Sequence, residues 1–300
     1  MDLMQAMKTY VSVVETGGFT AAARKLDISL SVVSRLVTEL EAHLGVRLLT
    51  RSTRVVRPTD TGAAYFENCK RILGDIEEAE LTAAGTHTSP RGQLVVTAPV
   101  LFGAMHVTPI VVEYLRRYPE VDVNCLLLDR NVNLIDEGVD VGVRLGELPS
   151  SSLQAIPVGR VRRVMCASPS YLKAHGLPRT PEDLARHTLI QVTGISSLSE
   201  WRFVHEGEPL PYRFSPRLAT TTNDSAIAAA VAGLGLTRVM SYQIAGELWD
   251  DKLRVVMADY EPAPVPIHVI HREGRHAMQK VRAFLDLAID SLRADKSLNG

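Results

Sequence analysis

Residues 19–57 read FTAAARKLDISLSVVSRLVTELEAHLGVRLLTRSTRVVR, and this stretch decides the fold of the N-terminal part of the chain. It predicts a helix rich in small residues, a turn at 27–29 and a second helix at about 31–44. Gly45 is expected to end the second helix, and the arginine-rich segment after it predicts a short β-hairpin. Helix, turn, helix and basic hairpin in this order are typical of a winged module that reads DNA.

The stretches on either side of this module are also helical in pattern. Residues 2–16 carry apolar side chains at helical spacing, and Thr20 is expected to cap the helix that follows. Residues 59–84 predict a long helix whose apolar positions keep close to coiled-coil spacing. Because nothing local is expected to cover that stripe, it predicts pairing with a second subunit. The polar, breaker-rich run at 85–92 is interpreted as a hinge.

Beyond Gln93 the pattern changes to alternating strands and helices. This alternation predicts a mostly parallel sheet with helices on both faces, including a short helix at 132–137. A second unit of the same kind begins near Val161, and a late strand lies at 265–271. Two α/β lobes joined by crossing strands would leave a cleft between them, which is a common place for a small-molecule site.

Charge is distributed unevenly along the chain. The 300 residues carry 33 basic and 34 acidic side chains, a net charge of −1, so the whole-chain charge indicates no particular partner. Residues 1–62 hold 8 of the basic and 6 of the acidic side chains, and the segment 42–59 holds four arginines and no acid. A local basic patch on a near-neutral protein favours DNA binding through one small face.

The side chains expected to contact DNA lie at the start of the second helix and in the hairpin. Short polar residues there suit base edges, and Arg35 is the best candidate for a guanine edge or a phosphate. Ser52 and Thr53 can donate hydrogen bonds to phosphate oxygens. An ordinary solvated helical surface is the alternative interpretation. The full candidate set is Thr20, Ser29, Leu30, Ser31, Ser34, Arg35, Arg51, Ser52, Thr53, Arg54 and Arg57.

No pattern in the chain indicates catalysis, a metal site or a membrane span. His268 and His271 are three apart on an expected strand, which places them on opposite faces. The three cysteines form no CxxC pair, and no nucleophile-elbow motif is present. We therefore expect no enzyme activity, no cofactor, no metal and no membrane partner. The N-terminus has no signal-peptide pattern, so the expected location is the cytoplasm.

The motifs FTAAARKLDIS, VVSRLVTELEAHLGVRLLTRSTR and PTDTG together resemble the N-terminal domain of LysR-type transcriptional regulators. The segments APVLFG, DEGVDVGVRLGELPSSSL and CASPSYLKAHGLPRTPEDL resemble the CrgA-like subgroup of that family. The resemblance covers essentially the whole chain. It implies tetramers that bind and bend a promoter. The chain departs from the family pattern at Asp27, Leu30, Ser31 and Leu36, which makes the operator sequence less transferable than the fold.

The resemblance also implies the domain organisation, which is α/β with an N-terminal helical part. A winged helix-turn-helix DNA-binding domain is expected at 1–58, and a dimerising linker helix and hinge at 59–92. The remainder, 93–300, is expected to be a two-lobed effector-binding domain shaped like a periplasmic binding protein. Lobe I is expected to take about 93–161 and 268–300, and lobe II about 162–267.

By resemblance, three segments should line the cleft that binds a small-molecule effector. Strand ends and helix starts there would present free N–H groups, which favour anions. Thr97 and Asn223 offer neutral hydrogen bonds, and the acid Glu147 argues against a simple anion site. The candidates are Thr97, Ala98, Pro99, Phe102, Gly103, Gly146, Glu147, Leu148, Asn223 and Asp224. The expected function is a ligand-responsive regulator that binds double-stranded promoter DNA as a homodimer or homotetramer. The alternative is an α/β small-molecule-binding protein or enzyme whose helical N-terminus only dimerises.

Overall fold

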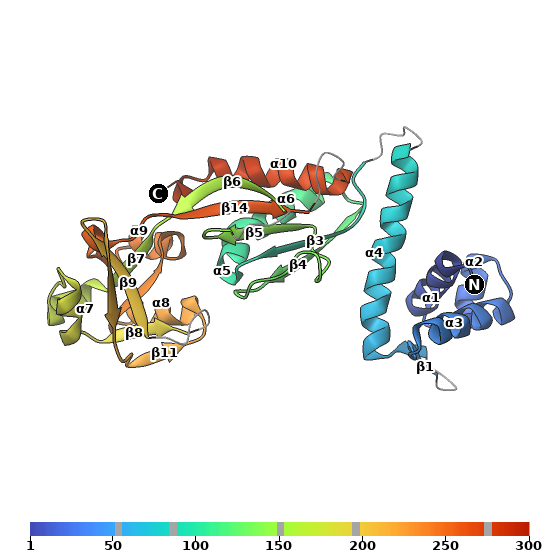
Figure 1. Cartoon of the computed structure of the whole chain (residues 1–300), viewed down its shortest axis with the longest axis horizontal. Helices are drawn as coiled ribbons and strands as arrows, with labels where there is room; N and C mark the ends of the chain where they lie inside the picture. Colours follow the sequence, from blue (N-terminus) through green and yellow to red (C-terminus); the bar gives the residue numbers. More distant parts are fainter. Residues whose placement is uncertain (52–55, 84–88, 149–152, 194–198, 273–277, 300) are drawn as a thin grey trace. The chain divides into compact units, whose positions relative to one another are not determined.

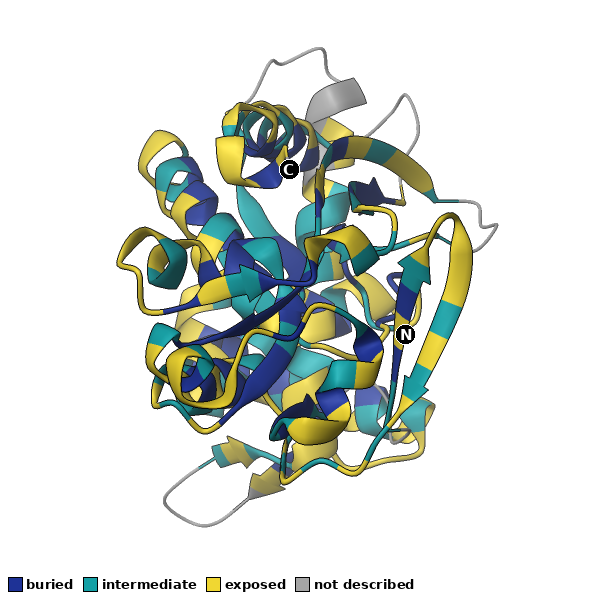
Figure 2. Ribbon diagram, turned by 90° about the vertical axis from the view of Figure 1, so that its left-hand side faces the viewer, coloured by how far each residue is buried: buried dark blue, intermediate teal, exposed yellow. Residues whose placement is uncertain are grey.

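The computed structural model describes residues 1–51, 56–83, 89–148, 153–193, 199–272 and 278–299 (Figure 1). The chain forms two compact units, Met1–Gln93 and Leu94–Gly300. Buried segments, dark blue in Figure 2, follow the strands and the inward faces of the helices. Each unit therefore has its own hydrophobic core and is described by itself.

Three helices open the N-terminal unit: α1 (Leu3–Thr16), α2 (Phe19–Leu26) and α3 (Leu30–Leu44). The predicted turn is confirmed, because Asp27 ends α2 in the left-handed conformation with φ 53°. The prediction that Thr20 caps α2 was wrong. The N-cap position is Gly18, which has no side chain to accept a hydrogen bond, and Thr20 lies exposed in the first turn.

The wing is an antiparallel pair, β1 (Leu49–Arg51) and β2 (Val56–Pro58), in which Leu49 lies opposite Pro58. Glu41 fastens it to α3, because its carboxylate accepts hydrogen bonds from the backbone N–H groups of Leu48 (2.8 Å) and Leu49 (3.1 Å). The wing is therefore held at a fixed place on the three-helix core. The fully buried side chains of that core are Ala6, Tyr10, Val13, Ala22, Val33, Val37, Leu40 and Leu48.

The linker helix α4 spans Asp60–Ala83. The Thr59 hydroxyl accepts a hydrogen bond from the N–H of Gly62 (2.9 Å), which satisfies a free donor of the first turn. The expectation that nothing local covers the apolar stripe was wrong for its first half, where Cys69 is fully buried against the core of the same unit. Ile72, one turn further, is 38% exposed.

Lobe I of the second unit is built on a five-stranded sheet in the order β4-β3-β5-β14-β6. Helices α6 and α10 cover one face, and the Tyr114 and Phe284 rings meet there edge to face at 5.3 Å. The segment 132–139 covers the other face. The predicted helix at 132–137 was wrong, because this segment forms turns. The elements are β3 (Gly92–Ala98), β4 (Val121–Leu127), β5 (Val141–Leu145), β6 (Gln154–Val161), β14 (Val265–His271), α5 (Val100–Phe102), the π-helix η1 (Gly103–Val107), α6 (Thr108–Arg117) and α10 (Gln279–Ala294).

Lobe II carries a second five-stranded sheet, in the order β11-β8-β12-β7-β13. Helix α8 packs on one face, while α7 and the hairpin β9-β10 cover the other. The elements are β7 (Arg163–Ala167), α7 (Pro169–His175), η2 (Pro181–Arg186), β8 (Leu189–Val192), β9 (Glu200–His205), β10 (Glu208–Arg213), β11 (Leu218–Thr220), α8 (Asn223–Val231), β12 (Leu236–Met240), η3 (Ser241–Ile244), α9 (Ala245–Trp249), β13 (Arg254–Val256) and η4 (Ala258–Tyr260).

Among the described strand pairs, most strands of each sheet run in the same direction, as predicted, and one strand of each sheet is reversed. In lobe I, β3 and β5 are parallel, but β14 is antiparallel to both β5 and β6. In lobe II, β8 runs parallel to β11 and β12, whereas β7 is antiparallel to β12 and β13. The reversed strands β7 and β14 are the first strands after the chain crosses from one lobe to the other. Because β14 belongs entirely to the lobe I sheet, the chain re-enters lobe I at Val265.

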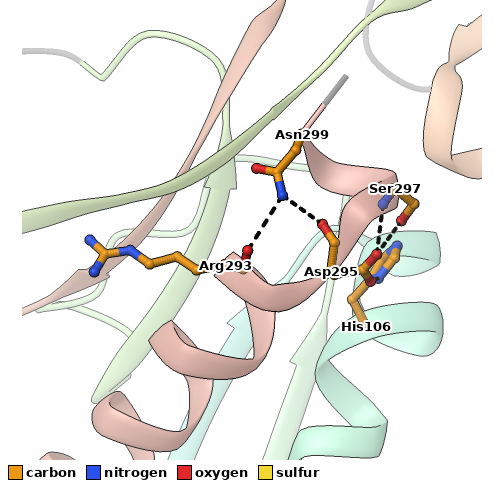
Figure 3. A network of polar contacts seen from close by, with 5 residues as sticks. All are labelled: His106, Arg293, Asp295, Ser297 and Asn299. Atoms are coloured by element: carbon orange, nitrogen blue, oxygen red, sulfur yellow. Dashed lines mark hydrogen bonds and ion pairs between the residues drawn. The ribbon is translucent and has the colours of Figure 1, made fainter.

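The C-terminal turn η5 (Lys296–Leu298) is fixed against lobe I by a polar network (Figure 3). The Asp295 carboxylate accepts hydrogen bonds from the backbone N–H (2.9 Å) and the hydroxyl (2.7 Å) of Ser297. Its other oxygen lies 3.0 Å from Nδ1 of His106 in the π-helix. The Asn299 side chain donates to the carbonyl oxygen of Asp295 (3.0 Å). The network joins η1 to the end of the chain.

The burial of His106 at this place predicts a loss of stability in mild acid. Burial lowers the pKa of His106 below its ordinary value, against the raising effect of Asp295. The unfolded chain then binds more protons, so the stabilisation is complete above the ordinary histidine pKa and is lost as the pH falls through the folded pKa. We expect the free energy of unfolding in urea to fall between about pH 7 and pH 5. His106→Gln should make that slope shallower, and identical slopes for both proteins would contradict the assignment.

Candidate DNA-binding surface and interlobe pocket

The N-terminal end of α3 presents short polar side chains to solvent. Ser29 is its N-cap, and the Ser29 hydroxyl accepts a hydrogen bond from the N–H of Val32 (3.4 Å) and lies 2.9 Å from the hydroxyl of Ser31. Leu30, between them, is 50% exposed. The exposed Leu30 side chain suits contact with a thymine methyl group, and the hydroxyls of Ser29 and Ser31 suit hydrogen bonds to base edges. Both kinds of group are found in the major groove of DNA.

One face of α3 continues this surface, because Ser31, Ser34 and Arg35 are three and four residues apart. The Arg35 side chain is 66% exposed, and its Nε lies 3.9 Å from Oε1 of Glu39. An exposed pair at that distance contributes little, so the guanidinium can turn to another anion. Leu36 points the other way and is buried. Its departure from the family pattern therefore leaves the exposed face unchanged.

The wing extends the basic surface beyond α3. Arg57 is exposed on β2, and its carbonyl oxygen accepts a hydrogen bond from the Thr50 hydroxyl (3.0 Å) across the hairpin. Arg51 ends β1. The predicted contacts Ser52, Thr53 and Arg54 lie outside the described residues.

A pocket of about 220 Å³ opens between the two lobes. The ends of β4 and β5 form its lobe I wall, and β7, β12 and the start of α8 form its lobe II wall. Two of the predicted effector residues, Pro99 and Asn223, line this pocket. Asp224 follows in the first turn of α8, where its carboxylate accepts a hydrogen bond from the N–H of Ser225 (2.9 Å).

The other predicted effector residues lie elsewhere in lobe I. The Thr97 hydroxyl is fully buried and donates to the carbonyl oxygen of Leu126 (2.7 Å), so the sheet uses it. Ala98, Phe102 and Gly103 are buried in the lobe I core. Gly146, with φ 114°, ends β5. Glu147 and Leu148 line a second pocket, of about 460 Å³, that lies within lobe I and shares Arg144 with the interlobe pocket.

Four arginines line the interlobe pocket: Arg130, Arg144, Arg163 and Arg238. Arg144 begins one of the three segments expected by resemblance to line the cleft, whereas sequence reasoning missed the other three. The four are scattered along the chain, and no spacing rule connects them. A signal was nevertheless present. Three of them stand inside otherwise apolar strands, in VGVRL, RVMCA and LTRVM. A charged side chain in a buried strand needs a partner, and that need marks a site.

The four arginines differ in their ion pairs, their hydrogen bonds and the shifts of their pKa values. Arg130 is engaged at the rim, where it forms a bidentate pair with the carboxylate of Glu137 (2.7 and 2.6 Å). The Nη2 of Arg144 is buried and has no hydrogen-bond partner among the described residues. Burial, together with the nearby charge of Arg163, lowers the pKa of Arg238 to about 9, against the opposite effect of Glu261. Burial also lowers the pKa of Arg163.

Two further observations bear on what the chain can do. Within the described residues, no cluster of three or more His, Cys, Asp or Glu side chains could hold a metal ion. No helix in the described part of the chain is long and apolar enough to span a membrane.

Both units match families of known proteins. Residues 4–63 match the bacterial regulatory helix-turn-helix proteins of the lysR family, and residues 87–293 match the LysR substrate binding domain. A transcriptional repressor from Pseudomonas aeruginosa is 33% identical, over 97% of this chain and 92% of its own. The transcriptional regulator CrgA from Neisseria meningitidis serogroup B is 30% identical, over 96% of each chain. These relatives are regulators of transcription rather than enzymes.

Solved structures agree with the sequence relatives. The structure of CrgA from Neisseria meningitidis superposes with a TM-score of 0.62 at 30% identity, covering 96% of this chain and 98% of its own. Full-length AphB, a virulence activator from Vibrio cholerae, gives a TM-score of 0.62 at 25% identity, covering 97% and 99%. The helix-turn-helix unit, the two-lobed unit and the two family matches lead to one conclusion: the chain belongs to the LysR family of bacterial transcriptional regulators.

Proposed function

We propose that this regulator contacts promoter DNA with the N-terminal end of α3 and the wing, and senses a small molecule in the interlobe pocket. The observation that carries the proposal is that both lobes contribute charged side chains to one pocket. A ligand held by both lobes binds one lobe arrangement better than another, and it can shift the protein only by that difference in affinity. The regulator would act in the cytoplasm, where its promoter lies.

The proposed DNA contacts fall into two groups. Ser29, Leu30, Ser31, Ser34 and Arg35 of α3 would meet base edges in the major groove. Thr20 of α2 and the wing residues Arg51, Ser52, Thr53, Arg54 and Arg57 would contact phosphates, which position the protein without reading sequence. The exposure of Ser31, Arg35 and Arg57 supports this division, because each is accessible without rearrangement of the core.

Oligomerisation is common to regulators of this family, and we propose that α4 mediates it here in a homodimer or homotetramer. The exposed Ile72 and the half-buried Ile76 continue the stripe of α4 beyond the part that its own unit covers. Pairing would bring two copies of α3 to one DNA site. A ligand-driven change in the lobes would then alter the spacing of the two DNA-binding units.

Arg35→Ala tests the DNA contact. We expect promoter binding to weaken by about 1–3 kcal/mol, because a guanidinium on a base edge or phosphate is lost. The measurement is a mobility-shift titration on the region upstream of its own gene, repeated at several salt concentrations. If Arg35 contacts a phosphate, the log–log salt slope should also decrease in magnitude by about 1.

Arg213→Ala is the matched control for Arg35→Ala. This arginine is 88% exposed on the lobe II hairpin, far from α3 in the sequence, and pairs with Glu200. It should leave the titration unchanged. Equal promoter affinity for wild type, Arg35→Ala and Arg57→Ala would show that α3 and the wing do not carry the DNA contacts.

A further inference from the structure

The interlobe pocket carries more positive charge than its acidic neighbours offset. Asp129 is the one acid among its described lining residues, and its carboxylate already accepts a hydrogen bond from the N–H of Val100 (3.0 Å). Glu137 offsets Arg130. Arg144 and Arg163 form no ion pair within the described part of the chain. A protein keeps such unpaired charges in a partly buried site at a cost to its stability.

On the lobe II wall, two of the arginines lie on neighbouring strands. In the β7-β12 ladder, Arg238 lies opposite Met165 and Arg163 lies opposite Met240. Arg163 and Arg238 are therefore diagonal neighbours on the same face of the sheet.

The Arg238 guanidinium donates to the carbonyl oxygen of Arg202 (2.5 Å), and its Cζ lies 5.0 Å from the centre of the Phe203 ring. These contacts do not neutralise its charge, so Arg163 and Arg238 still repel each other, and an anion beside both would reduce the repulsion. After burial, the charge of Arg163 is the next cause that lowers the pKa of Arg238, which agrees with this proximity.

On the lobe I wall, Arg144 stands at the end of β5. Its Nη1 donates to the carbonyl oxygen of Val143 (3.2 Å), whereas its buried Nη2 has no partner among the described residues. A buried donor without a partner destabilises the protein by more than a typical hydrogen bond stabilises it. A ligand atom that accepts a hydrogen bond from Nη2 would remove that penalty and would therefore bind strongly. The planar guanidinium matches a carboxylate or a phosphate in shape.

We propose that the interlobe pocket binds a small organic molecule with two anionic groups, one against Arg144 of lobe I and the other against Arg163 and Arg238 of lobe II. This assignment rests on the sensing role proposed above for the same pocket. The volume of about 220 Å³ is below the range of about 300–1,000 Å³ typical of drug-sized ligands, so the ligand is small. A short dicarboxylate and a phosphorylated short acid share this chemistry.

The two anionic groups also explain how binding could be sensed. A molecule with one anionic group satisfies one wall and leaves the lobes independent. A molecule with two holds Arg144 and Arg163 at once and favours the arrangement in which both walls reach it. A ligand with one anionic group would therefore only occupy the pocket, whereas a ligand with two would also change the arrangement of the two lobes.

The test is thermal unfolding and calorimetry of the full-length protein with matched probes at constant ionic strength. Succinate, glutarate and 2-phosphoglycolate carry two anionic groups, and butyrate, pentanoate and glycolate are their counterparts with one. We expect at least one of the first three to raise the Tm and to bind at least about tenfold more tightly than its counterpart. Which of them binds distinguishes a dicarboxylate from a phosphorylated acid.

Variants assign the effect to the pocket. Arg144→Gln and Arg163→Gln should each weaken that binding at least about tenfold, whereas Arg186→Gln, on the surface of lobe II, should not change it. Without ligand, Arg163→Gln should unfold at the same or a higher temperature than wild type, because a repelled charge is removed, and this shows that the variant folds.

Two results would overturn the assignment. One is that none of the three probes binds more tightly than its counterpart, and the other is that binding survives in the Arg144→Gln, Arg163→Gln double variant. The sensing role fails separately, if no ligand bound in the pocket changes promoter affinity. Promoter binding that depends on Arg35 would stand in every case.

Discussion

Gly62→Ala is expected to destabilise the N-terminal unit by about 3 kcal/mol and to abolish promoter binding. A Cβ atom at this position would lie 2.0 Å from the carbonyl oxygen of Leu48, which is backbone and cannot turn aside. The same oxygen accepts the hydrogen bond from the N–H of Thr59 (2.9 Å) that closes the wing onto α4. The wing must therefore move away from α4. Urea unfolding of the full-length protein and a mobility-shift titration measure the two effects.

Gly74→Ala is the control on the same helix. Its Cβ would meet nothing within 4 Å, so alanine removes only the flexibility of glycine in a helix. We expect a gain of about 0.5–1 kcal/mol and unchanged promoter binding. If Gly62→Ala behaved like Gly74→Ala, the close approach of wing and linker helix would be wrong.

Phe102→Ala is expected to destabilise the C-terminal unit by about 3–5 kcal/mol, because it empties a fully buried site. The Phe102 ring meets the Tyr242 ring edge to face at 5.3 Å and the His106 ring at 4.8 Å. Tyr242 in turn lines the interlobe pocket. The cavity would therefore loosen the packing between η1 and η3. Thermal unfolding followed by near-ultraviolet circular dichroism measures the loss of packing.

Phe102→Leu separates packing from ligand contact. It keeps much of the volume, so the expected cost is smaller than for alanine. Because Phe102 does not line the interlobe pocket, the folded leucine variant should keep the ligand affinity of wild type. A variant with unchanged stability and lost ligand binding would instead support the sequence-based assignment of Phe102 to the effector site.

The helix-turn-helix could be predicted from sequence because its signals are local. Asp27 tolerates a left-handed turn, Gly45 ends α3, and the apolar stripe of α3 has helical spacing. The reversed strand in each sheet of the second unit could not be predicted in the same way. Whether β14 runs parallel or antiparallel to β5 depends on how the chain returns from the other lobe, which no short stretch encodes. The hairpin β9-β10 was missed for a different reason, because its two prolines and many polar residues weaken the strand pattern.

The site was predicted at the level of segments but not of side chains. The family resemblance pointed to the ends of β3 and β5 and the start of α8, and Pro99 and Asn223 there do line the pocket. Thr97 and Phe102 lie on the same segments but face the interior. Sequence spacing cannot tell a strand residue that faces the cleft from its neighbour that faces the core. The pocket arginines come from four separate strands and loops, so only the fold brings them together.

The path of the chain between the lobes limits how they can move. Among the described segments it crosses twice, from β6 to β7 and from η4 to β14, and Val161 lies opposite Val265 where the crossings pair. Arg162 of one crossing and Glu261 of the other form an ion pair at 3.3 Å. Two adjacent connections define a single axis, so the soft motion of lobe II is rotation about it. Arg163 follows Arg162 in the chain and so lies close to this axis. A small displacement of its side chain by a ligand therefore corresponds to a rotation of the whole lobe. The edge of lobe II farthest from the axis moves the greatest distance in that rotation.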